Sequence, residues 1–431
     1  MGTQVAQALA ALRNLGTTEE IRALADDGFG PPVPPAVNAH IHLPPNFSAF
    51  ESVEQAIDLA SQQEIGVLGV SNYYDYEVYG DFVERARAHG IFPLFGLEII
   101  SMLEGLRESG VKANDPGNPG KTYICGKGIT RFGEMTDKAS RMLNTIRRND
   151  RERMQQMTSR LQSLFAERGL ENDVDEQAVI DMIAGRHGSS RETIYVQERH
   201  VSQAFQEALH EKIPAKDRIA QLNTLLGADT QAGGPEDAVG IQNDIRSHLM
   251  KAGKPAFVDE KFLTFDEATQ LILELGGIPS YPTLADGTSP LCQFEADIDH
   301  LTDTLQGEGI YAAEWILPRN TTAVMREYVT KMRAAGMVLT AGTEHNTLDL
   351  IPIEPRLADG PVPEDLKAIF WEGACVVAAH QFLTLHNECG YVDSAGQLNP
   401  QYPTADVRIA SLARIGAAVI GRYQETCSNI V

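Results

Sequence analysis

The sequence predicts an α/β protein in which a barrel of parallel strands is interrupted by a helical domain. Short apolar segments alternate with amphipathic helical segments between residues 37 and 100, and this alternation returns after residue 253. The intervening residues 131–250 are rich in Arg, Gln and Glu at helical spacing, as expected for an inserted helical domain. A chain of 431 residues is long enough for one large barrel with such an insertion.

In the first part of the chain, predicted strands are short apolar runs, and predicted helices have apolar residues three or four positions apart. One or two helical turns are expected within residues 4–26, before the proline-rich segment 30–35. The elements that follow are a strand at 37–43, a helix at 52–64, a strand at 65–71, a helix at 81–90 ending at glycine, and a strand at 91–100.

After the helical middle, the same criteria predict the second part of the barrel. Its elements are a helix at 264–276, strands at 277–282 and 311–317, a helix at 322–336, a strand at 337–346 that runs into a loop, and a closing helix at 407–426. We therefore divide the chain into an N-terminal helical extension (1–32), a first barrel part (33–130), a helical insertion (131–250), a second barrel part (251–360) and a mixed or helical C-terminal extension (361–431).

Charge separates the same parts. The chain has 36 Lys and Arg residues against 59 Asp and Glu residues, for a formal net charge of −23. The helical middle is nearly neutral, with 16 basic and 19 acidic residues, whereas the rest has 20 basic and 40 acidic residues. Because an acidic surface repels phosphate backbones, we expect no nucleic-acid partner.

The N-terminus and the cysteines indicate a reducing compartment. No basic region precedes the first apolar run, which Gln7 and Arg13 interrupt, so a secretory signal is not predicted. The five cysteines are scattered and form no CxxC pair, which argues against a disulfide framework and a structural zinc site. Apolar stretches such as 373–379 are far shorter than the ~20 residues that cross a bilayer. We expect a cytoplasmic protein without a membrane partner.

The sharpest local feature is His40-Ile41-His42. Residues two apart on a strand face the same side, so both imidazoles can reach one metal ion, and Asn38 is placed to orient one ring. The alternative is a chance pairing in a chain with 11 histidines.

Two further strand ends offer possible metal ligands. Glu98 ends the apolar strand at 91–100, and Glu344 with His345 follows the strand near 340. Taken singly, each is explained by an exposed strand end or a loop. Because the C-terminal strand ends of a barrel meet at one face, together they favour a metal site there.

Other charged residues are candidates for binding an anion. Arg199 and His200 stand just before a predicted helix, whose N-terminus favours negative charge, although a capping or surface role also explains them. Arg319 is a weaker candidate, and Asp75 and Glu77 lie in a polar aromatic loop. The sequence contains no GxGxxG, Walker, GxSxG or HExxH motif, so nucleotide-binding and serine-hydrolase functions find no support.

Six segments occur in a characteristic order between residues 37 and 350. They are NAHIHL, GLE at 96–98, ERHVSQAF, KPAFVDEKFLTFDEATQLILELGGIPSYP, AAEWILPRN and AGTEHN. This order resembles the polymerase and histidinol phosphatase (PHP) superfamily of metal-dependent phosphoesterases, in particular its members with a helical insertion. The resemblance implies a distorted, TIM-like (β/α)7 barrel.

The resemblance also suggests site residues. It implies His40, His42, Glu98 and Glu344 as ligands of one or two divalent ions (Zn, Mn or Fe), and more loosely His200. His345 would be the catalytic acid or base, or a further ligand. A helical lid would carry Arg199 and His200 to a small anionic substrate, with Tyr281 as a further contact.

The sequence departs from the family pattern at several ligand positions. Ser71-Asn72-Tyr73 replaces Thr-Asp-His, Tyr123 and Tyr281 replace histidines, and Asn346 stands where the final histidine is expected. A full three-metal cluster is therefore not expected. The tyrosines either hydrogen-bond a substrate or fill the space of absent metals.

Three functions remain open. The first, which we favour, is a metal-dependent hydrolase, most simply a phosphoesterase acting on a small phosphorylated molecule through a metal-activated water. The second is a catalytically degenerate PHP-like domain that binds a ligand or a protein. The third is a metal-dependent hydrolase or isomerase of non-phosphate substrates. The sequence does not indicate an oligomeric state.

Overall fold

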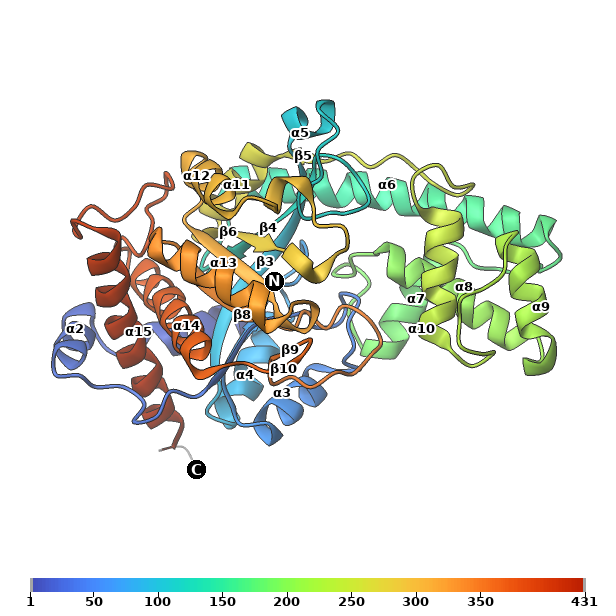
Figure 1. Ribbon diagram of the computed structural model, residues 1–431. Helices are drawn as coiled ribbons and strands as arrows, with labels where there is room; N and C mark the ends of the chain where they lie inside the picture. The colour runs from blue at the N-terminus through green and yellow to red at the C-terminus, as the bar shows by residue number, and fades with distance from the viewer. Residues whose placement is uncertain (1–2, 429–431) are drawn as a thin grey trace.

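The computed structural model describes residues 3–428; the outermost residues of the two predicted terminal extensions, 1–2 and 429–431, lie outside the described part. Seven strands form one continuous sheet in the order β1-β2-β3-β4-β6-β7-β8. Figure 1 labels β3, β4, β6 and β8 of this sheet. Their bounds are β1 Ala36–Ile41, β2 Ile65–Val70, β3 Phe92–Met102, β4 Lys121–Lys127, β6 Ile278–Thr283, β7 Ala312–Ile316 and β8 Val338–Gly342. The short strand β5 (Leu263–Thr264) adds to β3.

The sheet curls into a nearly closed barrel, so the predicted α/β barrel is confirmed. Its two outer strands meet through backbone hydrogen bonds: the His42 N–H donates to the Glu344 carbonyl at 2.9 Å, and the Glu344 N–H to the His40 carbonyl at 2.8 Å. Neighbouring strands are parallel except around β4, which is antiparallel to both β3 and β6. The helical insertion follows β4, so it enters the barrel where the parallel order breaks.

Helices follow most strands, as the alternating pattern predicted. Their starts have local causes: Ser52 accepts a hydrogen bond from the Gln55 N–H at the start of α3, and Thr264 and Glu267 form a capping box at the start of α11. The bounds are α3 Val53–Gln62, α4 Tyr79–Ala88, α5 Glu104–Glu108, α11 Phe265–Glu274, α12 Ile298–Gly307 and α13 Thr322–Ala334, with a small hairpin of β9 (Arg356–Leu357) and β10 (Gly360–Pro361) after β8.

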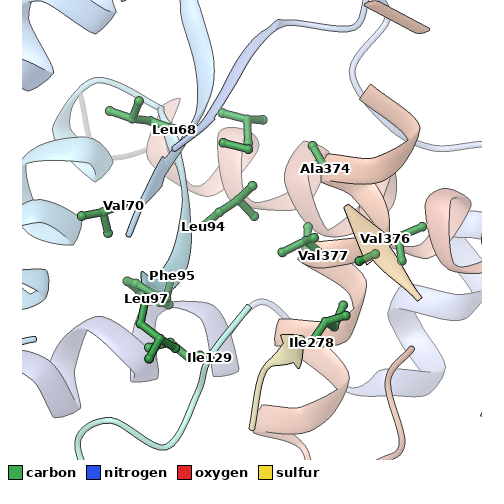
Figure 2. Close-up of a cluster of buried hydrophobic side chains, with 14 of the residues drawn as sticks. Leu68, Val70, Leu94, Phe95, Leu97, Ile129, Ile278, Ala374, Val376 and Val377 are labelled. Atoms are coloured by element: carbon green, nitrogen blue, oxygen red, sulfur yellow. The ribbon is translucent and has the colours of Figure 1, made fainter. Parts of the chain in front are cut away.

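Helix α14 (Glu364–Leu385) packs against the N-terminal ends of the strands. Its Gln381 accepts from the Phe95 N–H at 2.9 Å and donates to the Pro93 carbonyl at 3.1 Å, at the beginning of β3. Figure 2 shows Val377 of α14 among barrel side chains such as Leu94 and Ile278. Helices α1 (Thr3–Arg13), α2 (Thr18–Asp26) and α15 (Ala405–Ser428) surround this side of the molecule.

Helix α14 also corrects an expectation from the sequence. This helix is long and apolar enough to cross a membrane. The short apolar run at 373–379 had suggested that no segment of the chain is long enough. In the structure, 72% of its most apolar window is buried inside the protein, as in the core helix of a folded domain.

The middle of the chain forms a helical body beside the barrel (Figure 1). Its elements are α6 Asp137–Glu167, α7 Glu176–His187, α8 Glu198–Lys212, α9 Ala215–Leu226, α10 Ala238–Ile245 and a π-helical turn at Arg246–Met250. It has its own apolar core, separate from that of the barrel, in which the rings of Phe165 and Phe205 lie 4.8 Å apart. The long helix α6 connects the two bodies, since its first turns pack on the barrel core through Leu143 and Ile146.

Candidate metal centre and its cavity

Three buried side chains converge near the mouth of the barrel: His40 at the end of β1, His42 just after it, and Glu98 of β3. The two Nε2 atoms lie 3.3 Å apart, and Glu98 Oε2 lies 3.5 Å from Nε2 of His40 and 3.2 Å from that of His42. Ligand atoms about 2.0–2.2 Å from a tetrahedral ion are separated by about 3.3–3.6 Å. The triangle therefore has the dimensions of one face of a tetrahedral coordination sphere.

The hydrogen bonding of Glu98 fits the same interpretation. Its Oε1 accepts a hydrogen bond from the Tyr73 hydroxyl at 2.8 Å, whereas Oε2 is buried and has no hydrogen-bond partner among the described residues. Although burial raises the pKa of Glu98, the contacts with His40 and His42 lower it below its ordinary value. An ionised oxygen directed at two imidazole nitrogens suits a divalent cation.

A second layer of residues holds these ligands. Glu314 of β7 lies 2.8 Å from His40 Nδ1 through Oε1, and it pairs with Lys127 of β4 through its other oxygen. Burial lowers the pKa of His40, but the charge of Glu314 and hydrogen bonds to Glu314 and Glu98 together outweigh burial and raise that pKa to about 9. Tyr73 stacks on His42, with ring centroids 5.3 Å apart and planes 6° from parallel. Such outer contacts fix the orientation and tautomer of ligands.

Sequence reasoning missed Glu314 and Lys127 as site residues. Their signal is a charged residue inside an apolar strand, in AAEWI and in KTYICGK, since a buried charge needs a partner. The sequence does not reveal which charges meet.

A cavity of about 480 Å³ lies over the triangle, between the barrel mouth and the helical insertion. His40 and Glu98 form part of its floor, with Tyr73 and Tyr123 beside them. The charged residues in its wall are six basic and six acidic side chains: Lys121, Arg153, Arg199, Arg246, Lys251, Arg319, Glu98, Asp115, Asp150, Glu198, Glu260 and Glu344. Three of these basic groups, Arg153, Arg199 and Arg246, come from the insertion, and Lys251 directly follows it.

Three basic groups in or next to the insertion gather around one carboxylate. Glu198 contacts Arg153 Nη2 at 2.6 Å, Lys251 Nζ at 2.8 Å and Arg246 Nη2 at 3.7 Å. The adjacent Arg199 has no hydrogen-bond acceptor for its guanidinium within residues 3–428, and its guanidinium carbon lies 5.8 Å from the centre of the Phe47 ring. Burial and the neighbouring Arg246 lower the pKa of Arg199 to about 10, an environment that an added anion would relieve.

Glu344 lines the cavity but lies outside the triangle. Its carboxylate pairs with Arg319, and the described residues that converge at the centre do not include it. Glu98, in turn, does not end its strand as expected, because β3 continues to Met102 by pairing with β4.

His345 is not among the described residues that line the cavity. Its Nδ1 is 2.7 Å from Thr343 Oγ1, its Nε2 is 3.0 Å from the Ile351 carbonyl, and its ring stacks on Phe50. Both ring nitrogens are thus engaged by the protein, and Asn346 lines the cavity instead. This geometry does not favour the predicted catalytic role of His345.

The three predicted substrate contacts are separated by the fold. Arg199 lines the cavity. His200 accepts a hydrogen bond from the Gln197 N–H at 3.1 Å and packs against Phe47, so it caps helix α8. Tyr281 is fully buried and donates to Glu295 at 2.9 Å; neither it nor His200 is among the described residues that line the cavity.

Two asparagines have structural roles. Asn72, in the Ser-Asn-Tyr segment, accepts from the Leu43 N–H at 2.8 Å and donates to the Leu43 carbonyl at 2.9 Å, which ties the end of β1 to the end of β2. Asn38 accepts a hydrogen bond from the backbone N–H of His40 and donates one to Thr343. It therefore supports the strand, whereas the sequence had suggested that it orients an imidazole ring.

Comparisons with known proteins define the fold class. No protein-family model matches the chain, and no curated protein matches it. Among solved structures, it is similar to a protein of Bifidobacterium adolescentis provisionally described as a metal-dependent phosphoesterase, with a TM-score of 0.53 and 13% identity over 79% of this chain and 96% of that one. It is also similar to an amidohydrolase of Chromobacterium violaceum, solved with sulfate and without metal, with a TM-score of 0.50 and 17% identity over 78% and 96%. The likeness establishes a shared barrel fold.

Proposed function

We propose that the protein is a metal-dependent hydrolase of the PHP type whose substrate is a small phosphoester. The observation that carries the proposal is the triangle of His40, His42 and Glu98, with coordination spacing, beside a cavity of about 480 Å³. A bound divalent ion would supply an activated water with a pKa near 7 and polarise the scissile group. The two similar solved structures, described as a metal-dependent phosphoesterase and an amidohydrolase, support this reaction class.

The remaining residues prepare the centre and the substrate. Tyr73 holds the Glu98 carboxylate, and Glu314 holds the His40 ring, so the three donor atoms keep their spacing. Arg199 and Arg246 reach the cavity from the insertion and bind the anionic group. The insertion forms part of the cavity wall at the barrel mouth, so its charged groups act on a bound substrate at short range.

An anionic substrate is supported by the basic groups that remain after pairing. One carboxylate, Glu198, faces three cations, and Arg199 has no carboxylate partner in the part of the chain that the structure describes. Arg246 Nε is also buried without a hydrogen-bond acceptor among those residues. Partly buried guanidinium groups with free donors are suited to phosphate or carboxylate.

A second candidate is the same hydrolytic chemistry on a non-phosphate substrate such as an amide or a lactone. It is favoured by the replaced family positions, since Asn72 and Tyr73 now make contacts within the protein. A centre with fewer ligands than the family pattern also suits carbonyl hydrolysis by one ion.

The first test is metal content. We expect purified protein to contain bound divalent metal by elemental analysis, and the His42→Ala and Glu98→Ala variants to lose it. Glu344→Gln is the matched control, because Glu344 lines the same cavity outside the triangle and its loss should leave the metal in place. Wild-type protein without metal after incubation with Zn²⁺, Mn²⁺ or Fe²⁺ would refute the proposal.

The second test is a substrate panel of phosphomonoesters, phosphodiesters, amides and lactones. Turnover of a phosphoester that disappears in Glu98→Ala supports the phosphoesterase. Turnover only of amides or lactones with the same dependence selects the second candidate. A metal-loaded protein that turns over none of them would be a binding domain.

A further inference from the structure

The barrel contains a second group of possible metal ligands next to the first. It consists of His40, Cys125 and Glu314, whose donor atoms lie within 4.8 Å of one another and are all buried. The number of ions at the centre therefore depends on whether this second group can also bind a cation.

The two groups share His40. A neutral imidazole has one nitrogen with a lone pair and one that carries hydrogen, so it coordinates one ion through one nitrogen. If Nε2 faces Glu98 and His42, then Nδ1 carries the hydrogen and donates to Glu314, 2.8 Å away. The second group then lacks its nitrogen ligand.

Lys127 already supplies a cation at this place. Its ammonium pairs with Glu314 and donates to the Ala39 carbonyl at 3.2 Å and to Ser71 Oγ at 3.3 Å. An ammonium has three N–H donors, and three acceptors surround this one. Lys127 is 3% exposed and Glu314 is fully buried, so each charge depends on the other.

We propose that Lys127 takes the place of a second metal ion in the barrel. The centre then holds a single divalent ion, and Lys127 is a positioning residue that holds Glu314 and, through it, the His40 ring. This inference rests on the metal-binding function proposed above. It specifies the number of ions and assigns a role to a lysine that sequence reasoning had not considered.

The test is a titration with Co²⁺, which replaces many divalent ions in such sites and reports its ligands by absorption. We expect wild-type protein to bind one Co²⁺ per chain and to show no thiolate-to-cobalt charge-transfer band. The Cys125→Ser variant should bind the same amount with an unchanged spectrum. Two ions per chain in the wild type, or a thiolate band that Cys125→Ser removes, would overturn the inference.

The Lys127→Met variant tests the role of the ammonium directly. Its loss leaves Glu314, the Ala39 carbonyl and Ser71 Oγ without their cation, and Cys125 lies close to Glu314, so we expect more than one Co²⁺ per chain and a new thiolate band. Lys127→Arg keeps the positive charge and should behave as the wild type does. A folded Lys127→Met protein with wild-type stoichiometry and spectrum would overturn the inference.

The outcomes also separate the two proposals. A wild-type protein that binds no ion refutes the metal-dependent hydrolase itself. One that binds two ions refutes only the role of Lys127. If circular dichroism shows that Lys127→Met does not fold, the titrations of wild type and Cys125→Ser still decide the number of ions and the part of Cys125.

Discussion

The hydroxyl of Tyr73 offers a sharp test of how the metal centre is built. The Tyr73→Phe variant removes one oxygen, the donor of the 2.8 Å hydrogen bond to Glu98 Oε1, and keeps the ring that stacks on His42. We expect the variant to fold and to bind metal more weakly, because Glu98 loses the contact that directs its other oxygen toward the imidazoles.

The size of the effect follows from the contact. A hydrogen bond to a charged group is worth about 1.5–3 kcal/mol, and Tyr73 and Glu98 are both buried, so water does not replace it. If the hydrogen bond stabilises mainly the metal-bound protein, its loss lowers the affinity for metal about 10–100-fold. This is the usual effect of removing a residue that hydrogen-bonds to a metal ligand. The melting temperature of the metal-free protein should fall as well, because Glu98 Oε1 is left without a partner.

The assay is competition between the protein and a chromophoric chelator for Zn²⁺. Tyr123→Phe is the matched control, since Tyr123 lines the same cavity and its hydroxyl makes no hydrogen bond to the triangle in the described residues. An affinity of Tyr73→Phe equal to that of Tyr123→Phe would show that the hydroxyl does not position Glu98, and the argument for a preorganised ligand would fail.

Three further predictions concern the frame of the site. Asn72→Ala should lower the free energy of unfolding, measured in urea, by about 2–5 kcal/mol, because it leaves the buried N–H and carbonyl of Leu43 without hydrogen-bond partners. A loss below about 1 kcal/mol would mean that water or a local rearrangement of the backbone provides new partners. Burial raises the pKa of Glu295 to about 7, so the folded state retains a proton that the unfolded state releases near pH 4.5. The contribution of Glu295 to stability should therefore decrease by about 3 kcal/mol as pH rises from 4.5 to 7, and unfolding curves of Glu295→Gln across this range should lack that part of the slope. Gly373→Ala should destabilise by at least about 1–3 kcal/mol or prevent folding, since its Cβ would lie 1.9 Å from the Leu339 carbonyl oxygen; a wild-type melting temperature would show that α14 can move away.

The part of the centre that sequence reasoning could place depends on local spacing. His40 and His42 are two residues apart on one strand, so their common direction follows from the strand repeat alone. Glu98 belongs to a short Gly-Leu-Glu segment inside an apolar run. Its strand β3 is separated from β1, at whose end the histidines lie, by only one strand, β2. The fold class was likewise predictable, because alternating strands and helices have few ways to pack.

The rest of the centre depends on side chains that meet across the barrel. Lys127 and Glu314 come from β4 and β7, and no local pattern shows that they face each other. Glu344 and His345 are misleading for a different reason: both have left-handed backbone conformations, with φ of 66° and 52°, so their directions no longer follow the alternation of β8. Glu344 thus meets Arg319, and His345 turns toward Thr343.

The charges of the centre explain how an acidic protein can bind an anion. The chain has a formal net charge of −23, which opposes the approach of a phosphate from a distance. With one divalent ion in the triangle and Lys127 in place, Glu98 and Glu314 leave the centre with a single net positive charge. Arg199 and Arg246 add to it from the insertion, so an anion in the cavity is attracted over a short range. One ion and one lysine therefore provide the local charge that a small anionic substrate needs, without a second metal.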